Sequence, residues 1–356
     1  MEISFRLWYI IYILFYGGNV VANYTHVSFD GLGINFDLPS VAFNLFGYEI
    51  HWYGIVIAFG FALAVLYGGR KAYKWKMSLD GMTDVLIWGT LIGIICARLY
   101  YVAFEWDYYS QHLNEIPAIW NGGIAIYGGI IGALIGAAIG CKIGKIDFFN
   151  LLDLGSLGLL IGQGIGRWGN FFNQEAFGCN TDTALFRMWS PKIHDTLEQS
   201  AELLAQKGMI VDPNTPVHPT FLYESVWCLL SFVVLHFIVT YKREFKGEIF
   251  MLYGILYGAE RMIVEGLRTD SLYIGSTTIR VSQLLSAIIV VVALVSFVYF
   301  MTLCKKQKLP KSLVLDDLDA LEDANKKAKE EAQRRKQEKA EKKRLKKEEK
   351  QKKKDK

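Results

Sequence analysis

Residues 151–178 carry an apolar run that ends in polar and charged groups: LLDLGSLGLLIGQGIGRWGNFFNQEAFG. The run is long enough to cross much of a bilayer, and Arg167, Asn170, Asn173 and Glu175 follow at its end. An ionisable side chain at membrane depth costs about 3 kcal/mol even on the mildest scale, so such residues are candidates for a functional site. A phosphate or a carboxylate is the expected partner of the arginine.

The composition indicates the same class of protein. Of 356 residues, 52% are hydrophobic and 14% aromatic, and the mean hydropathy is +0.22 although the C-terminal tail is highly charged. We therefore predict an all-α, polytopic membrane protein with a soluble tail. Its five cysteines are scattered without C-x-x-C spacing or histidine partners, so we predict no metal site, and no cofactor motif is present.

Seven apolar segments predict a bundle of about seven transmembrane helices. They are residues 53–69, 84–104, 123–141, 151–166, 221–241, 248–264 and 281–304. Lysines and arginines follow the first, third, fifth and seventh segments, whereas the alternate loops contain few of them. Because basic residues collect on the cytoplasmic side, the start of the first segment is predicted outside and the C-terminus in the cytoplasm.

The polar parts of the chain define the remaining predicted organisation. We expect an N-terminal segment with an outer lead-in, membrane helices, an extracytoplasmic insert, further membrane helices and a tail: residues 1–50, 51–170, 171–219, 220–304 and 305–356. The insert is long enough to form a small cap, with a helix over 195–207, that covers a lipid site or receives a second substrate.

Both ends of the chain leave alternatives open. The apolar stretch Phe5–Tyr16 is short for a span, so it is a signal-peptide core, an interfacial helix or a kinked eighth segment; we favour the interfacial helix. The tail after Cys304 holds 21 Lys and Arg against 12 Asp and Glu, a net charge of +9. It is predicted to attract anionic lipid headgroups. RNA binding is the weaker alternative, and no nucleic-acid partner is predicted.

Glycines shape the third segment. Gly128, Gly132, Gly136 and Gly140 recur every four residues, a pattern that allows close helix packing. The Gly-Gly pairs on either side of residues 124–127 indicate a broken helix start, which membranes tolerate only where protein or a cavity covers it. Tyr127 is then either a cavity residue or an aromatic anchor at the interface.

The predicted orientation gathers polar residues in one leaflet. They are Tyr53, Arg98, Tyr127, Arg167, Asn170, Glu175, Tyr257, Arg261 and Arg268. Arg261 and Glu265 have the spacing of an ion pair on one helix face, and a purely structural pair is one interpretation. We favour the other: the arginines outnumber nearby carboxylates and bind an anionic ligand, most economically a phospholipid headgroup.

Several motifs resemble one known family. The thirteen residues G-R-W-G-N-F-F-N-Q-E-A-F-G at 166–178 are similar to the motif of the prolipoprotein diacylglyceryl transferase family. Supporting matches are H-W-Y-G at 51–54, A-R-L-Y-Y at 97–101, G-G-I-A-I-Y-G-G at 122–129, H-P-T at 218–220 with L-Y-E at 222–224, and Y-G-A-E-R-M-I-V-E at 257–265. The resemblance excludes residues before about 40 and the tail.

The resemblance implies a bacterial inner-membrane enzyme with seven helices. Such enzymes move the diacylglyceryl group of phosphatidylglycerol to the thiol of a lipobox cysteine in a prolipoprotein, and glycerol phosphate leaves. It further implies that seven residues matter for activity, with Arg167 on the phosphatidylglycerol: Tyr53, Arg167, Asn170, Glu175, Gly178, Tyr257 and Arg261. This chain departs from well-studied members at Tyr127, where they carry a histidine proposed as the base.

The residue types fit this chemistry independently. A thiol with a pKa of about 8.5 must lose its proton, and a phosphate monoester must leave with its charge stabilised. We assign the stabilisation of the phosphate charge to Arg167 and Arg261, whose planar guanidinium groups suit phosphate. We expect Arg98 and Arg268 to assist binding. Asn170 orients the headgroup, and Glu175 either fixes an arginine or accepts the proton.

The proton acceptor and the class of protein each have alternatives. Tyr127, with an ordinary pKa of about 10, is a poor base, so it positions the substrate or the lipid phosphate takes the proton. A transporter or lipid scramblase also uses glycine-interrupted helices and polar groups in the membrane. A lipid-binding scaffold without catalysis is the third possibility. The concentration of polar residues in one leaflet favours the transferase.

Overall fold

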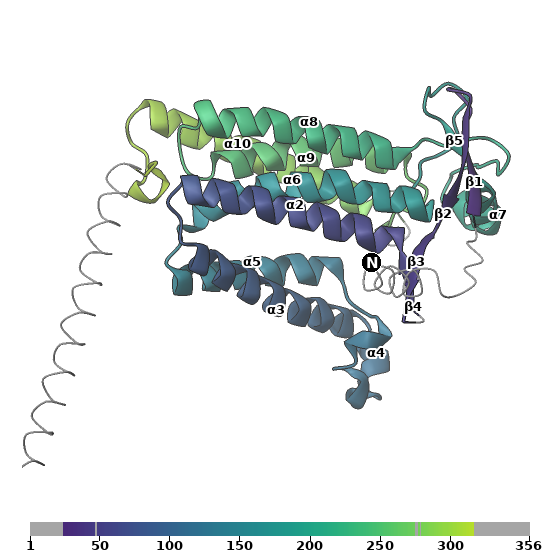
Figure 1. The fold of residues 1–356 in the computed structure, drawn as a ribbon, viewed down its shortest axis with the longest axis horizontal. Coiled ribbons are helices and arrows are strands. Elements are labelled where there is room, and N and C mark those ends of the chain that lie inside the picture. The colour runs from purple at the N-terminus through teal and green to yellow at the C-terminus, as the bar shows by residue number, and fades with distance from the viewer. Residues whose placement is uncertain (1–23, 47, 275–276, 278, 317–356) are drawn as a thin grey trace, which may run out of the picture. The chain divides into compact units, whose positions relative to one another are not determined.

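The structure is a computed structural model that describes residues 24–46, 48–274, 277 and 279–316 (Figure 1). Its strands are β1 Tyr24–Phe29, β2 Ile34–Pro39, β3 Val41–Leu45, β4 Tyr48–His51 and β5 Met188–Trp189. Its α-helices are α2 Trp52–Lys74, α3 Leu79–Phe104, α4 Trp106–Tyr109, α5 Ile126–Gly144, α6 Phe148–Asn173, α7 Pro191–Gln206, α8 Thr220–Tyr241, α9 Glu248–Leu267 and α10 Val281–Lys305. Short 3-10 helices cover Leu113–Glu115, Ile119–Asn121 and Lys311–Leu313.

Two compact units divide the described chain. The first contains residues 24–70 and 147–313, and the second contains residues 71–146 with the described residues from 314. The predicted N-terminal stretch Phe5–Tyr16 and most of the predicted basic tail lie outside the described residues.

The first unit is built around α6, which packs against α8 and α9, while α10 covers α9 (Figure 1). The α6 helix begins where the Asp147 side chain accepts a hydrogen bond from the Asn150 N–H and so caps the first turn. Leu154, Leu157 and Leu160 recur at helical spacing on its face and are almost fully buried. This helix carries the polar motif of residues 166–178 at its C-terminal end.

A small cap lies at that end of α6 (Figure 1). Its three-stranded sheet has the order β2-β1-β5 with antiparallel pairing, and α7 packs against β1. Apolar residues of the cap, among them Val27, Ile193 and Leu197, share one core with Phe171 of α6 and Phe221 of α8. The cap is therefore attached to the bundle by a continuous hydrophobic core.

The cap differs from the prediction in its strands. The helix predicted over 195–207 is present as α7, which begins earlier because the Ser190 side chain caps it at the Ile193 N–H. Residues before His51 were predicted only as a lead-in, yet β1 and β2 pair with each other there, and β1 also pairs with β5 from the insert. The pairing of β1 with β5 joins segments so distant in the sequence that it leaves no local signal.

The second unit contains the close pair of α3 and α5. Gly128, Gly132, Gly136 and Gly140 are all buried, and a Cβ added to Gly132 would lie 2.5 Å from the carbonyl oxygen of Ile92 on α3. Backbone approach at this distance is possible only without side chains. The predicted packing role of the four glycines is confirmed.

Among the residues that the structure describes, six helices are long and apolar enough to cross a membrane: α2, α3, α5, α6, α8 and α10. The sixth predicted segment, residues 248–264, forms α9, a helix of 20 residues, but Glu260, Arg261 and Glu265 make it less apolar than the others. The prediction of an all-α, multi-pass membrane protein is confirmed, with the cap strands as a small addition.

The N-terminal half of α6 carries a buried ion pair in which Asp153 is fully inaccessible to solvent. One of its carboxylate oxygens accepts the Gly247 N–H at 2.8 Å and an Arg243 guanidinium nitrogen at 2.6 Å, and the other accepts the Phe250 N–H at 2.9 Å. Arg243 also donates to Asn150 at 2.7 Å. Asp153 thus fixes the turn between α8 and α9 against α6.

Candidate functional site

Arg167, on the last turns of α6, forms an ion pair with Glu224 on α8. The Glu224 side chain is 1% exposed, whereas 21% of the Arg167 side chain remains accessible. A carboxylate so deeply buried requires cationic partners, and the sequence supplies them from three directions. Glu224 is therefore the centre of the candidate site.

Two further arginines converge on the same carboxylate. Arg261 of α9 lies 3.1 Å from one Glu224 oxygen and also 2.5 Å from Glu265, one turn away. Arg268, directly after α9, lies 3.8 Å from the other Glu224 oxygen and makes two hydrogen bonds to Asp270 at 2.7 and 2.9 Å. Although burial alone would raise the pKa of Asp270, the bonds and charge of Arg268 lower it and keep Asp270 ionised.

The end of α6 and the turn after it orient Arg167 through the Asn170 amide and the Glu175 carboxylate. The Arg167 guanidinium donates to Asn170 at 3.3 Å, and the Asn170 amide donates to Glu175 at 3.0 Å. Glu175 can reach back because Gln174 and Ala176 adopt left-handed backbone conformations, with φ of 49° and 57°. Such residues carry a conformational cost of about 1–2 kcal/mol each. The geometry thus gives Glu175 an indirect hold on Arg167, one of the two roles predicted for it.

Gly178 lies where three segments meet. Its N–H donates to the His218 carbonyl at 2.9 Å, and it forms a bridge with Arg268 after α9. A Cβ at this position would lie 2.8 Å from the Cβ of His218. The structure therefore assigns Gly178 to close packing that holds Arg268 beside the turn.

His218 acts within the same junction as a packing residue. Its ring lies 3.1 Å from the Tyr223 hydroxyl, and burial lowers the pKa of the imidazole. Its backbone N–H also donates to Cys179 at 3.0 Å. These contacts tie the cap to the start of α8.

The two predicted tyrosines of this unit flank the cluster. The Tyr53 ring lies against Gly169, where an added Cβ would be 2.9 Å from a ring carbon. Tyr257 precedes Arg261 by about one turn of α9, and its ring stacks on Tyr253 with 5.5 Å between centroids. The first unit thus brings together eight predicted residues: Tyr53, Arg167, Asn170, Glu175, Gly178, Tyr257, Arg261 and Arg268.

The other two predicted residues, Arg98 and Tyr127, belong to the second unit. Arg98 is 5% exposed and donates to four backbone carbonyls, those of residues 115, 116, 122 and 123, at 2.7 to 2.9 Å. Because a guanidinium has five N–H groups, little capacity is left for the lipid phosphate that we expected it to bind. Arg98 instead fixes the loop before α5, whose first turn contains Tyr127.

The predicted charge balance of the cluster requires correction. We expected arginines to outnumber nearby carboxylates, but Arg167, Arg261 and Arg268 are each paired with an acidic group. Glu224 was predicted only as part of the L-Y-E motif at 222–224. Its position near the start of an apolar helix was the available signal, since an acidic residue there needs a buried cation.

A second acidic residue was also missed. Glu260 of α9 is 2% exposed, and neither carboxylate oxygen has a hydrogen-bond partner among the described residues. One carboxylate oxygen of Glu224 likewise has no hydrogen-bond partner among the described residues. The charge of Glu260 interacts with those of Glu224, Arg261 and Arg167.

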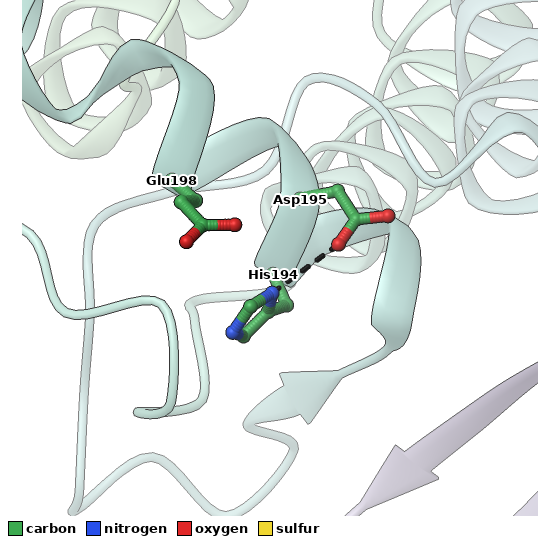
Figure 2. A group of neighbouring side chains, drawn as sticks. All are labelled: His194, Asp195 and Glu198. Atoms are coloured by element: carbon green, nitrogen blue, oxygen red, sulfur yellow. Dashed lines mark hydrogen bonds and ion pairs between the residues drawn. The ribbon is translucent and has the colours of Figure 1, made fainter.

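One group of cap residues has the spacing of metal ligands. Atoms of His194, Asp195 and Glu198 lie within 4.8 Å of one another on α7, where Figure 2 shows the three side chains on one turn. The His194 ring and Asp195 are 3.3 Å apart. Exposed groups of this kind are also common on helix surfaces, and none of these residues belongs to the arginine cluster.

The fold and the cluster define a multi-pass helical membrane protein with a buried arginine–carboxylate site at one end of its bundle. A family model described as prolipoprotein diacylglyceryl transferase matches residues 40–299. The chain belongs to this family. The predicted family is thereby confirmed, together with the predicted enzyme class, a transferase of the first step of lipoprotein maturation.

Individual proteins similar to this chain carry the name of the same family. A phosphatidylglycerol–prolipoprotein diacylglyceryl transferase of Pediococcus pentosaceus is 42% identical over 278 residues, which cover 78% of this chain and 95% of the relative. The enzyme of that name from Lysinibacillus sphaericus is 42% identical over 261 residues, covering 73% and 91%. The one from Finegoldia magna is 42% identical over 258 residues, covering 72% and 94%.

Proposed function

We propose that this chain transfers the diacylglyceryl group of phosphatidylglycerol to the thiol of a lipobox cysteine in a prolipoprotein. The products are a thioether-linked lipid and glycerol 1-phosphate. The observation that carries the proposal is the accessible guanidinium of Arg167, held by Glu224 and Asn170 at the end of an apolar helix. A fixed, partly exposed arginine at this place suits an anionic lipid headgroup.

The lipid phosphate is the ligand of this site. Arg167 supplies the direct contact, because its side chain is 21% accessible, against 13% for Arg261 and 14% for Arg268. Asn170 and Glu175 hold the Arg167 group in orientation before the lipid arrives. Such preorganised charge stabilises the developing phosphate without reorganisation during the reaction. Arg261 contributes to the same positive potential from the neighbouring helix.

The bond changes balance without a cofactor. The cysteine sulfur attacks the glycerol carbon that bears the phosphate, so a C–S bond forms and a C–O bond breaks. The electron pair of the C–O bond stays with the phosphate oxygen, and the thiol proton passes to the phosphate. The arginines stabilise the charge of the departing glycerol phosphate.

This route gives Tyr127 a positioning role. We therefore expect Tyr127→Phe to retain transfer of the diacylglyceryl group, since no proton is taken by the phenol. Loss of transfer with unchanged phosphatidylglycerol binding would show that the hydroxyl participates in the chemistry.

We place the protein in the bacterial inner membrane with the arginine cluster toward the outer leaflet and the C-terminus in the cytoplasm. The supporting pattern is the basic residues after α2, α5, α8 and α10. Labelling of single cysteines in intact cells checks it: a cysteine at Asp182 in the cap should react with an impermeant reagent. A cysteine at Lys145 after α5 should react only after lysis, and the reverse pattern would overturn the orientation.

The activity itself is tested with purified protein in phosphatidylglycerol vesicles and a synthetic lipobox peptide. We expect the peptide to gain the mass of a diacylglyceryl group, and Arg167→Ala to lose at least about 100-fold in rate. Lipid movement between leaflets without that mass gain would identify a scramblase. Lipid binding with neither result would identify a scaffold. Glu198→Gln, on the exposed face of α7, is the matched control.

A further inference from the structure

Glu260 is a buried acidic group whose carboxylate has no hydrogen-bond partner in the described part of the chain, although the acidic groups around it are paired. Glu265 and Asp270 each bind an arginine, and one Glu224 oxygen binds two. By contrast, both oxygens of Glu260 and the second oxygen of Glu224 accept no hydrogen bond from the described residues. An ionised carboxylate left this way pays its full desolvation cost.

The balance of charges in the arginine cluster indicates that Glu260 retains its proton. Arg167, Arg261 and Arg268 are balanced by the three carboxylates of Glu224, Glu265 and Asp270 before Glu260 is counted. An ionised Glu260 would leave the buried site with net negative charge, and a lipid phosphate would add to it. A neutral Glu260 removes that repulsion.

The groups that face Glu260 support the same protonation state. Its charge interacts with Arg167 from α6, with Glu224 and Cys228 from α8, with Tyr253, Tyr257 and Arg261 on its own helix, and with Arg268. On the α10 side, α9 meets uncharged residues, Ser286 and Val290, at Gly258. Each arginine of this set already has a carboxylate partner, so none is reserved for Glu260.

We propose that Glu260 is a protonated residue at neutral pH, which keeps the arginine cluster receptive to an anionic lipid phosphate. A neutral Glu260 adds no negative charge beside the Glu224 carboxylate that holds Arg167. Ionisation of Glu260 at alkaline pH adds a negative charge and weakens phosphate binding. Its consequence for catalysis rests on the proposed function, whereas the protonation state does not.

Infrared spectroscopy tests the protonation state directly. The purified full-length protein at neutral pH should show the carbonyl stretching band of a protonated carboxylic acid. We expect Glu260→Gln to lack this band and Glu198→Gln, the exposed control on α7, to keep it. If Glu260→Gln does not fold, Glu260→Met replaces it, because methionine has similar volume and no charge. Identical spectra of the wild type and the neutral variant would overturn the proposal.

The pH dependence of transfer tests the consequence. In the wild type, the KM for phosphatidylglycerol should rise about tenfold per pH unit once Glu260 ionises, while the Glu260→Gln profile should lack this rise. Glutamine reproduces the neutral carboxyl, so transfer at neutral pH should persist in that variant. Equal alkaline profiles, or loss of transfer in folded Glu260→Gln, would contradict the role of Glu260. Absence of transfer in the wild type would instead contradict the proposed function and leave the infrared result standing.

Discussion

Each end of α6 lies at a buried ion pair, and the two ion pairs differ in how many of their hydrogen bonds are made. Near its start, Asp153 accepts two backbone N–H groups and Arg243, so both of its oxygens are satisfied within the protein. Near its end, Glu224 binds arginines through one oxygen and leaves the other without a hydrogen bond, and Arg167 stays partly accessible. A buried ion pair with all its bonds made supports the fold, whereas one with spare capacity can receive a ligand.

The largest expected effect is on stability, at the start of α6. Asp153→Ala leaves Arg243 without its buried carboxylate, which costs about 3–5 kcal/mol in comparable pairs. Thermal unfolding in detergent should show a large drop in the midpoint temperature. If the remaining folded Asp153→Ala protein transfers lipid at the wild-type rate, the two ends of α6 have separate roles. Unchanged stability would contradict the structural role of Asp153.

The next effect is on catalysis, at the end of α6. Arg167→Lys keeps the positive charge but loses the planar fork that binds Asn170 and that we propose binds the lipid phosphate. We expect at least a tenfold loss in the rate of diacylglyceryl transfer with little change in unfolding temperature. A variant with full activity would show that charge alone is required at this position.

A smaller effect separates the two roles considered for Glu175. Glu175→Gln keeps an oxygen that can accept the Asn170 amide but cannot accept a proton in the reaction. We expect transfer within about threefold of the wild type, because the net value of one such bond is about 1 kcal/mol. Glu175→Ala, which removes the acceptor, should fall further. Equal and complete loss in both variants would identify Glu175 as the proton acceptor.

The smallest expected effect concerns the junction of cap and bundle. Burial lowers the pKa of His218 from its ordinary value of about 6.5, so below that pH the unfolded chain binds more protons than the folded protein. Stability is therefore complete above about pH 6.5 and declines as the pH falls through that value. His218→Gln should reduce the difference between melts at about pH 7 and pH 5; an unchanged difference would assign it to other groups.

Local patterns predicted much of this molecule. Apolar length predicted the helices, and four-residue spacing predicted that Gly128 to Gly140 meet another helix, because both signals lie within one segment. Arg167, Asn170 and Glu175 of the 166–178 motif are linked by hydrogen bonds, while their predicted contact with lipid stays a prediction. The strands β1 and β2 were not foreseen, and the pairing of β1 with β5 joins segments that lie far apart in sequence. The ion pair of Arg167 with Glu224 depends on the packing of α6 against α8, and the sequence of one helix does not determine its neighbours.

The hydrogen bonds of Arg98 restrict the length of the loop between α3 and α5. These four bonds join the carbonyls of residues 115, 116, 122 and 123 to one point on α3, so the approach to α5 has a fixed geometry. The residues before that anchor are tied to it as well: the Tyr108 hydroxyl donates to the Glu115 carboxylate at 3.0 Å, and the Arg98 guanidinium lies 5.1 Å from the centre of the Tyr109 ring. One added residue between Ile116 and Gly122 should therefore shift Tyr127. The length of this loop is thus restricted for protein engineering.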